Sequence, residues 1–390
     1  MFQMYEEFAS SASQNLAIGL APMEGVSDFA FRMWLSAICP FDFLVTPFLR
    51  ATAGYDFRSV PPLFCPEIFD ECFHKRLRVI PQFMGSSPED LCKVALPFLD
   101  HSPYVDINCG CPSATVFRNG AGSALLKDPN RFFLFLKCCE EILGQRKYSV
   151  KLRVGVASPA EFADLLSALE QLKPALITVH GRTQKEGYTG LSRWDLIQQA
   201  AVKLPCPVYG SGDVVDSRTL LEKRAVAPAI QGIMIGRGAI ANPWVFWNLK
   251  YLNCDCGSLS QQQSNTNVEF GTLYWALGVF ALFQEAQFRG PDSVLHVVRT
   301  FRPWELLLGV DVQAWQDFYE KLSAHLFVKI LQPKDLTCDE RVISRLKQIT
   351  KLLKVGNNSI AQTKLLRTAS VAGFFAFFES AVLEKEGPLG

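Results

Sequence analysis

The side chains of this sequence that are best suited to chemistry stand at the ends of short apolar segments. Asn108, Cys109 and Cys111 close one such segment, Lys151 lies in the next, and His180 closes a third. A thiol with an ordinary pKa of about 8.5 is mostly protonated at neutral pH, so it can donate a proton. A lysine is costly to bury without a partner, so its place in an apolar segment points to a polar ligand. A cation beside a quinone-like ring stabilises the reduced anion, and these residues therefore favour flavin chemistry.

Two glycine-rich turns favour a phosphate group on that ligand. They are Gly210-Ser211-Gly212-Asp213 and Gly236-Arg237-Gly238. Glycine lets the backbone approach a ligand closely and turn its N–H groups toward an anion, and Arg237 adds a positive charge. Simple tight turns are the alternative for either segment alone. The second turn also matches the dinucleotide pattern G-x-G-x-x-A, but it does not open a two-strand βαβ unit.

Eight short apolar segments, several rich in β-branched residues, each end in a polar residue or glycine. Most lack a strict polar–apolar alternation, as expected of strands that are buried on both faces. The alternation of these segments with helical stretches predicts an α/β fold, a (β/α)8 TIM barrel with its site at the carboxyl ends of the strands. A doubly wound sheet is the alternative. The predicted strands are 16–23, 43–48, 79–85, 104–110, 149–155, 176–182, 207–213 and 232–238.

Apolar residues at helical spacing separate the predicted strands. Pro88, Pro129 and Pro159 stand near the starts of three of these stretches, where a helix tolerates proline. The clearest predicted helices are 89–99, 130–143, 160–172 and 194–202.

Composition narrows the class of protein. The chain has 390 residues, 49% hydrophobic and 20% charged, with a formal net charge of +1, which argues against a nucleic-acid coat that is basic all over. No apolar run is long enough to span a bilayer, and the first 15 residues do not resemble a secretory signal. Twelve cysteines are too sparse for a disulfide scaffold, and their spacing does not predict a metal site. We therefore expect a cytoplasmic monomer that needs no membrane and no metal.

The chain is long enough for a second, smaller domain after the barrel. We expect the barrel over residues 1–250, a polar linker over 251–267 and a helical domain over 268–390. Between Lys321 and Arg367 there are ten lysines and arginines against three acidic residues. A solvated helical face would explain this excess, and a surface that binds a polyanion such as RNA is the sharper interpretation.

Five ordered motifs resemble those of the tRNA-dihydrouridine synthases, most closely the C-type bacterial branch. The resemblance implies a flavin enzyme, with FMN as cofactor and NADPH as reductant, that reduces the C5=C6 bond of a D-loop uridine in tRNA, U16 in that branch. It also implies that Cys111, and not Cys109, protonates C5. The motifs are Ala21-Pro22-Met23-Glu24-Gly25-Val26, Asp106-Ile107-Asn108-Cys109-Gly110-Cys111-Pro112-Ser113, Gly122-Ser123-Ala124-Leu125-Leu126-Lys127-Asp128-Pro129, Val150-Lys151-Leu152-Arg153 and Val179-His180-Gly181-Arg182-Thr183.

The same resemblance assigns the other site residues. FMN is expected to contact Pro22, Met23, Glu24, Gln82, Lys151, His180, Ser211, Gly212, Asp213, Gly236 and Arg237. The tRNA substrate is expected to contact Asn108, Arg50, Arg153, Arg182 and Tyr188, because cationic and stacking groups suit a splayed base.

Two other functions remain open on the sequence. An FMN barrel oxidoreductase that acts on a small pyrimidine or enone would share the cofactor residues without needing a basic tail. A catalytically impaired tRNA-binding protein is the second, and it is supported by Ser211, where the family usually has asparagine.

Overall fold

The computed structural model describes residues 16–39, 41–69, 77–241 and 245–250. Contacts divide the chain into two units, Met1–Asp28 with Pro40–Asn253, and Phe29–Cys39 with Cys254–Gly390. The described part of the second unit contains helix α2 (Phe29–Ile38). The predicted linker and helical C-terminal domain lie outside the described residues. No helix in the described ranges is long and apolar enough to cross a membrane.

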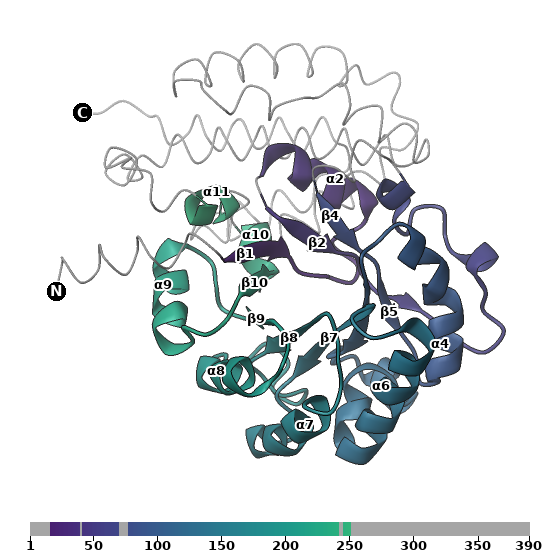
Figure 1. Ribbon diagram of the computed structural model, residues 1–390. Helices are drawn as coiled ribbons and strands as arrows, with labels where there is room; N and C mark the ends of the chain where they lie inside the picture. Colours follow the sequence, from purple (N-terminus) through teal and green to yellow (C-terminus); the bar gives the residue numbers. More distant parts are fainter. Residues whose placement is uncertain (1–15, 40, 70–76, 242–244, 251–390) are drawn as a thin grey trace, which may run out of the picture. The chain divides into compact units, whose positions relative to one another are not determined.

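The first unit is built on parallel strands that surround a common interior, with helices outside them (Figure 1). All strand pairs within the described ranges are parallel, in the order β3-β5-β6-β7-β8-β9-β10-β1-β2-β4. The strands are β1 (Ala17–Leu20), β2 (Phe43–Val45), β3 (Leu49–Arg50), β4 (Arg78–Ile80), β5 (Gln82–Met84), β6 (Val105–Cys109), β7 (Tyr148–Arg153), β8 (Leu176–His180), β9 (Val208–Ser211) and β10 (Gly232–Ile235).

The strand order begins with β3 and β5 and ends with β4. Pro81 alone separates β4 from β5 along the chain, so the two ends of the order are joined there. On one side of Pro81, β4 pairs with β2, and on the other side β5 pairs with β6. The carbonyl of Ile80 accepts from Thr46 N at 3.0 Å, and that of Pro81 accepts from Asp106 N at 2.9 Å. β5 also pairs with β3, which follows β2 along the chain. The strand interrupted at Pro81 therefore has a neighbour on each side, and the missing N–H of Pro81 marks only the interruption. Counting β2 with β3 as one strand of the barrel, and β4 with β5 as another, the barrel closes with eight strands, as the sequence predicts.

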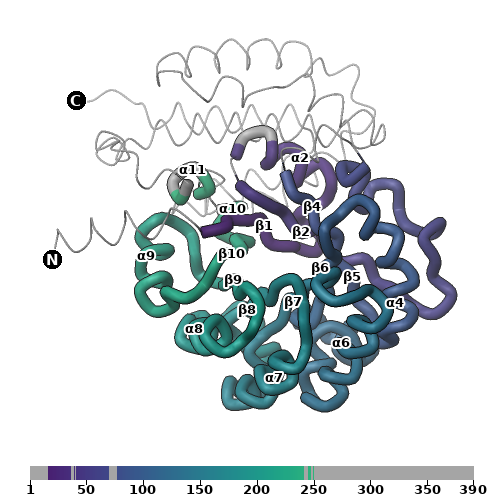
Figure 2. Tube along the Cα trace, in the orientation of Figure 1, coloured from purple at the N-terminus to yellow at the C-terminus, as the bar shows by residue number. Residues whose placement is uncertain are grey.

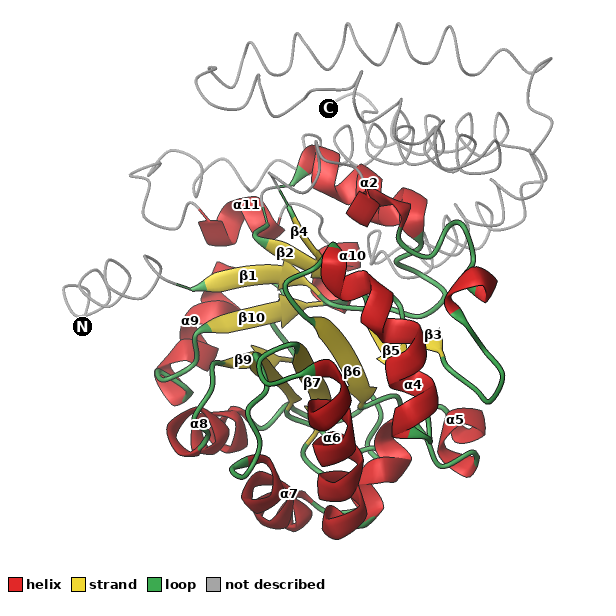
Figure 3. Cartoon of the chain, turned by 45° about the vertical axis from the view of Figure 1, so that its right-hand side comes forward, coloured by secondary structure: helices red, strands yellow, loops and turns green. Residues whose placement is uncertain are grey.

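Helices cover the outside of the barrel in the predicted order (Figures 2 and 3). Ser87 and Asp128 cap α4 and α6, and Pro88 and Pro129 follow them at the first helical position. Ser158 closes a capping box before α7. The helices after α2 are α4 (Pro88–Ala95), α5 (Ala114–Arg118), α6 (Pro129–Leu143), α7 (Phe162–Leu169), α8 (Trp194–Lys203), α9 (Ser217–Val226), α10 (Arg237–Ala241) and α11 (Val245–Lys250).

One side of the barrel interior is apolar and is filled by large rings over glycines. Phe43 and Tyr209 lie with ring centroids 5.4 Å apart. A Cβ atom on Gly19 would lie 2.3 Å from the Phe43 ring, and one on Gly232 would lie 2.6 Å from the Tyr209 ring. These two glycines therefore give the rings their space. The cluster comprises Ala21, Phe43, Val45, Ile80 and Met234, with Ala17, Tyr104 and Tyr209 packed against it.

The contact between Gly19 and Phe43 gives a stability prediction. We expect Gly19→Ala to lower the free energy of unfolding by about 2–3 kcal/mol, because the added methyl group overpacks a close-packed interior. The double variant Gly19→Ala/Phe43→Leu should recover more than half of that loss, because leucine vacates the ring position. Urea unfolding of the single and double variants measures both effects. A Gly19→Ala protein with the stability of the wild type would contradict the described packing.

Candidate functional site

The carboxyl ends of the strands bring the predicted site residues to one rim of the barrel. Parallel strands all end on the same side, so residues far apart in sequence become neighbours there. Strand register places Asn108 beside Lys151, Arg153 beside His180, and His180 beside Ser211. Around the same rim lie Pro22, Met23 and Glu24 after β1, Arg50 on β3, and Gly236 and Arg237 after β10. Gln82, at the start of β5, is fully buried below the rim.

Lys151 is the least satisfied charged group of this rim. Across the described ranges of the chain, its ammonium group has no hydrogen bond and no ion pair. Burial lowers the pKa of Lys151 to about 8; the charge of Arg153 acts in the same direction, and the charge of Asp106 opposes it. The Lys151 side chain is partly buried, and a cation that loses solvent without gaining a partner costs free energy. This position is therefore prepared for an electron-rich group of a ligand.

His180 is neutral and has a defined tautomer. Burial and then the charges of Lys151, Arg153, Arg182 and Arg237 hold its pKa well below the ordinary value. Its Nε2 atom lies 3.4 Å from Nη1 of Arg182. A guanidinium group only donates, so Nε2 accepts and the ring proton stays on Nδ1. His180 can therefore donate one hydrogen bond from Nδ1 without carrying charge.

The turn after β9 has a strained backbone that packs tightly. Gly212 has φ +120° and Asp213 has φ +59°, and a Cβ atom on Gly212 would lie 2.5 Å from Ser192 Oγ. The Ser211 hydroxyl makes no hydrogen bond within the described residues. Burial would raise the pKa of Asp213, but bonds from Arg182 and Ser192 N, with the charge of Arg237, lower it overall.

Cys111 lies half-buried at the start of the loop that follows β6. Its backbone N–H donates to Asn108 Oδ1 at 2.9 Å, and its carbonyl accepts from Ser123 Oγ at 2.6 Å. Gln184 Nε2 holds the next carbonyl, that of Pro112, at 3.1 Å. Burial raises the pKa of the Cys111 thiol above its ordinary value. The thiol is therefore positioned from both sides and stays protonated at neutral pH.

A hydrogen-bonded chain runs from the barrel interior to this loop. Asp106, 1% exposed, accepts from Ser149 Oγ at 2.5 Å and from Gln82 Nε2 at 2.7 Å. Gln82 Oε1 in turn accepts from Asn108 Nδ2 at 2.8 Å. Asn108 Oδ1 then accepts from the N–H groups of Gly110 and Cys111. We call Ser149, Asp106, Gln82 and Asn108 the interior polar chain.

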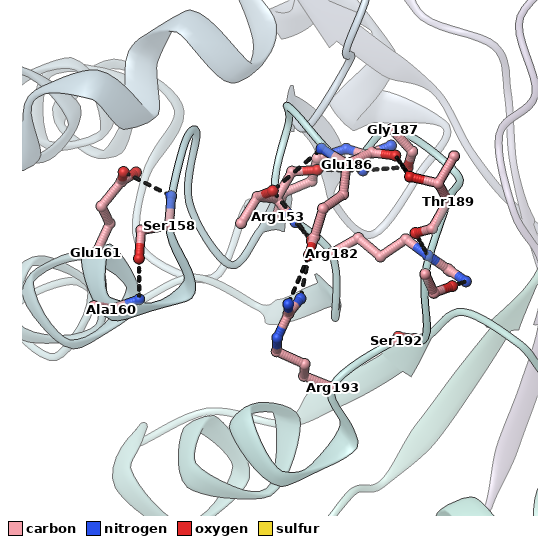
Figure 4. A network of polar contacts seen from close by, with 12 residues as sticks. Arg153, Ser158, Ala160, Glu161, Arg182, Glu186, Gly187, Thr189, Ser192 and Arg193 are labelled. Atoms are coloured by element: carbon pink, nitrogen blue, oxygen red, sulfur yellow. Dashed lines mark hydrogen bonds and ion pairs between the residues drawn. The ribbon is translucent and has the colours of Figure 1, made fainter.

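Two arginines that the sequence assigns to the substrate are used within the protein. Arg153 is 2% exposed, and it donates to the carbonyls of Gly110, Thr183 and Gly187 at 2.7–2.9 Å. Arg182, also 2% exposed, donates to Thr189 O, to Gly190 O and to both carboxylate oxygens of Asp213. Both point toward the segment 183–190 (Figure 4). This geometry leaves little of either guanidinium group for substrate, contrary to the expected contacts.

The segment 183–190 presents Tyr188 at the rim. Its side chain is 57% exposed, with the guanidinium carbon of Arg237 4.6 Å and that of Arg153 5.5 Å from the ring centroid. Within the segment, Glu186 forms an ion pair with Arg193, with Oε1 and Nη2 2.6 Å apart (Figure 4). Arg50 lies exposed on β3. Tyr188 and Arg50 are therefore both exposed at the rim, as contact with a large substrate requires.

Sequence reasoning did not assign a role to Asp106, Ser149 or Thr46. Thr46 Oγ1 accepts from the backbone N–H of Gln82, a position where the strand pairing is interrupted after Pro81. One signal was available in the sequence: Asp106 is a carboxylate in an apolar strand, two residues before Asn108 and so on the same face. The part of the chain that the structure describes contains no cluster of three or more His, Cys, Asp or Glu side chains suited to a metal.

Comparison with known proteins gives a consistent result. The sequence model of the family described as dihydrouridine synthase matches residues 19–270. The tRNA-dihydrouridine(16) synthase of Haemophilus ducreyi is 33% identical over 242 residues, 60% of this chain and 73% of that protein. That of Escherichia coli strain K12 is 31% identical over 236 residues, 60% of this chain and 75% of that protein.

Two further matches accompany these. The tRNA-dihydrouridine(47) synthase [NAD(P)(+)] of Coprinopsis cinerea is 35% identical over 185 residues, 43% of this chain and 27% of that protein. Among solved structures, morphinone reductase matches with a TM-score of 0.44 and 11% identity, over 60% of this chain and 85% of that chain.

The unpaired cation of Lys151 gives a pH prediction. A lysine whose folded pKa is lowered binds fewer protons than in the unfolded chain between about pH 8 and 10.5, so its penalty is full below pH 8 and is relieved as pH rises. We expect Lys151→Met to raise the free energy of unfolding of the ligand-free protein at pH 7 by about 2 kcal/mol. The difference from wild type should shrink toward pH 10.

Urea unfolding at pH 7, 8.5 and 10 measures this difference. Lys147→Met is the matched control, because Lys147 is exposed just before the same strand and should change stability little. Equal stability of Lys151→Met and wild type at pH 7 would contradict a partly buried, unpaired ammonium group.

The contacts of Arg153 predict a second effect. Lysine cannot reach three carbonyls at once, so Arg153→Lys should loosen the segment 183–190 and speed tryptic cleavage after the exposed Lys185 by about tenfold. Arg193→Lys, which weakens only the partly exposed pair with Glu186, should change cleavage by less than about threefold. Peptide mass spectrometry identifies the cleavage site. Equal rates in both variants would mean that Arg153 does not hold the segment.

Proposed function

The chain belongs to the dihydrouridine synthase family, and on that premise we propose that it reduces the C5=C6 bond of a D-loop uridine in tRNA, at position 16. The relatives that are named for position 16 support that position, since they match about three quarters of their own length. The family model covers most of the barrel, including every strand that contributes to the rim.

One observation carries the proposal: a partly buried ammonium group without a partner in the described residues, beside a protonated, half-buried thiol. Lys151 and Cys111 interact electrostatically, so they share one part of the rim. Reduction of a carbon–carbon double bond needs a hydride at one carbon and a proton at the other. The lysine offers a site for developing negative charge, and the thiol offers the proton.

Cys111 is the proposed acid. Because its pKa is raised by burial, the thiol holds its proton at the pH of the cell and can release it to C5 of the bound uracil. Cys109 is 0% exposed and lies on the face of β6 opposite Asn108, so it is not accessible to a substrate. Asn108 keeps one N–H that the interior polar chain does not use, and this group would donate to an oxygen of the uracil ring.

A flavin fits the rim that these residues form. The Lys151 ammonium group and the Ser211 hydroxyl both lack protein partners among the described residues, and both can bind the polar edge of a ring. The turns at Gly212 and Gly236, with Arg237, suit a phosphate group and so favour FMN. A bound flavin, reduced by NADPH, would supply the hydride to C6. Pro22, Met23, Glu24, Gln82, His180 and Asp213 would complete its contacts.

The proposed partner is tRNA. Exposed Arg50 and Tyr188 would contact the substrate directly, while Arg153 and Arg182 would act indirectly by holding the segment that carries Tyr188. We assign further tRNA contacts to the basic residues of a helical domain over 268–390, after a linker over 251–267. The excess of lysine and arginine there supports this assignment. A cytoplasmic monomer would suffice for this activity.

The roles of the two cysteines give a direct test. Cys111→Ala should lower dihydrouridine formation by at least about 100-fold while leaving reduction of the flavin by NADPH intact, because only the proton donor is lost. Cys109→Ala, the matched control, should retain activity within about threefold. Mass-spectrometric mapping of tRNA from cells that carry each variant in place of the wild type measures the modification at each position.

The pH dependence follows from the same thiol. The wild-type rate should stay flat through the ordinary pKa of a thiol and fall only at higher pH, where Cys111 loses its proton. An unchanged dihydrouridine map in cells without the gene, with flavin bound to the purified protein, would reject tRNA as the substrate. The small-molecule oxidoreductase would then be the better assignment.

A further inference from the structure

The interior polar chain contains a carboxylate at one end and the backbone N–H of Cys111 at the other. Asp106 lies too deep in the barrel to meet a substrate, since it is 1% exposed and its contacts are Ser149 and Gln82. It therefore has no place in the binding of uracil. Its position in the interior polar chain nevertheless connects it, through Gln82 and Asn108, to the loop that carries the thiol.

The direction of each hydrogen bond follows from the chemistry of the groups. Both carboxylate oxygens of Asp106 accept, one from Ser149 Oγ and one from Gln82 Nε2, so Gln82 turns its NH2 group toward Asp106. Gln82 Oε1 then faces Asn108, which must turn its own NH2 group inward. Asn108 Oδ1 is thereby left facing the rim, where it accepts from the N–H groups of Gly110 and Cys111 at 3.0 and 2.9 Å.

Either amide, turned over, would place an NH2 group against another donor. If Gln82 presented Oε1 to Asp106, its NH2 group would oppose that of Asn108. If Asn108 then turned over, its NH2 group would oppose the N–H of Cys111, and the loop would lose the acceptor that anchors it. Buried donors left without acceptors cost about 1–3 kcal/mol each, so the carboxylate selects one arrangement.

We propose that Asp106 is a positioning residue for the Cys111 loop, acting by setting the direction of the hydrogen bonds through Gln82 and Asn108. The catalytic meaning of this role rests on the proposed function, in which Cys111 is the proton donor. The geometric role does not, and it can be measured without tRNA.

The direction of the hydrogen bonds in the interior polar chain can be reversed by exchanging the side chains at 106 and 108. In the double variant Asp106→Asn/Asn108→Asp, residue 106 would donate to Gln82 Oε1, and Gln82 would donate to the carboxylate at 108. That carboxylate would still accept from the N–H groups of Gly110 and Cys111, and Ser149 would still donate to residue 106. Each hydrogen bond of the interior polar chain is thereby kept, with its direction reversed between residues 106 and 108. In Asn108→Asp alone, two carboxylates face a single glutamine, and one of them must oppose Oε1.

We therefore expect Asn108→Asp to lower Tm of the full-length holoenzyme by about 5 °C, and the double variant to recover at least half of that loss. Alkylation of Cys111 by iodoacetamide, followed by peptide mass spectrometry, should be at least about threefold faster in Asn108→Asp than in the double variant. Both proteins carry a carboxylate at position 108, and Asn108→Asp also keeps the carboxylate at 106. That extra negative charge disfavours the thiolate and would slow alkylation, so a faster reaction in Asn108→Asp cannot come from charge.

A second pair separates hydrogen-bond direction from charge. Asp106→Asn can still accept from Gln82 and should keep uridine reduction within about fivefold of wild type. Asp106→Leu, of similar size, offers no acceptor and should slow uridine reduction by the pre-reduced enzyme on the order of 100-fold. Flavin reduction by NADPH should change much less in both. Thr178→Val is the control, because it replaces a buried hydroxyl that does not belong to the interior polar chain. Its rate of uridine reduction should match that of wild type.

A double variant no better than Asn108→Asp in both Tm and alkylation would overturn the proposal, as would equal losses in Asp106→Asn and Asp106→Leu. If the wild-type enzyme fails to reduce tRNA, the proposed function fails, while Tm and alkylation of the exchanged pair still decide the role of Asp106.

Discussion

Closure of the parallel sheet at Pro81 is the constraint on which the rest of the structure depends. The strand that contains Pro81 pairs with β2 through β4, and with β3 and β6 through β5, and Pro81 marks the interruption between these two segments. Gln82, the next residue, gives its backbone N–H to the Thr46 side chain and turns its own side chain toward Asp106. The same interruption that closes the barrel therefore aims the first amide of the interior polar chain.

The barrel interior is divided between two kinds of packing. Around β10, β1, β2 and β4 it is apolar, with Phe43 and Tyr209 seated over glycines. Around β5, β6 and β7 it is polar, and Asp106, Gln82 and Ser149 satisfy one another. Buried polar groups are stable only as a complete network. The apolar side supplies the stability of the barrel, and the polar side fixes the positions of the groups at its rim.

The rim of the barrel, from β7 round to β10, carries more positive than negative charge. Lys151, Arg153, Arg182 and Arg237 gather there, and Asp213 is paired with Arg182, while His180 stays neutral. Arg153 and Arg182 are satisfied by backbone carbonyls, so Lys151 is left as the unsatisfied cation. An arrangement of this kind lowers the stability of the ligand-free protein and favours an electron-rich ligand, which is the usual relation between a binding site and its fold.

The sequence by itself determined the eight strands and the starts of α4 and α6, and it singled out Cys111 and Lys151 as candidate site residues. These depend on local patterns: short apolar segments, proline after a capping residue, and motifs of a few adjacent residues. Only the tertiary structure decided the roles of Arg153, Arg182 and Asp106. Their partners lie on other strands and loops, as when Arg153 reaches Gly110 across 43 positions and Asp106 meets Gln82 across 24. A side chain's chemical type is written in the sequence, but its hydrogen-bond partners depend on which strands the closed barrel places side by side.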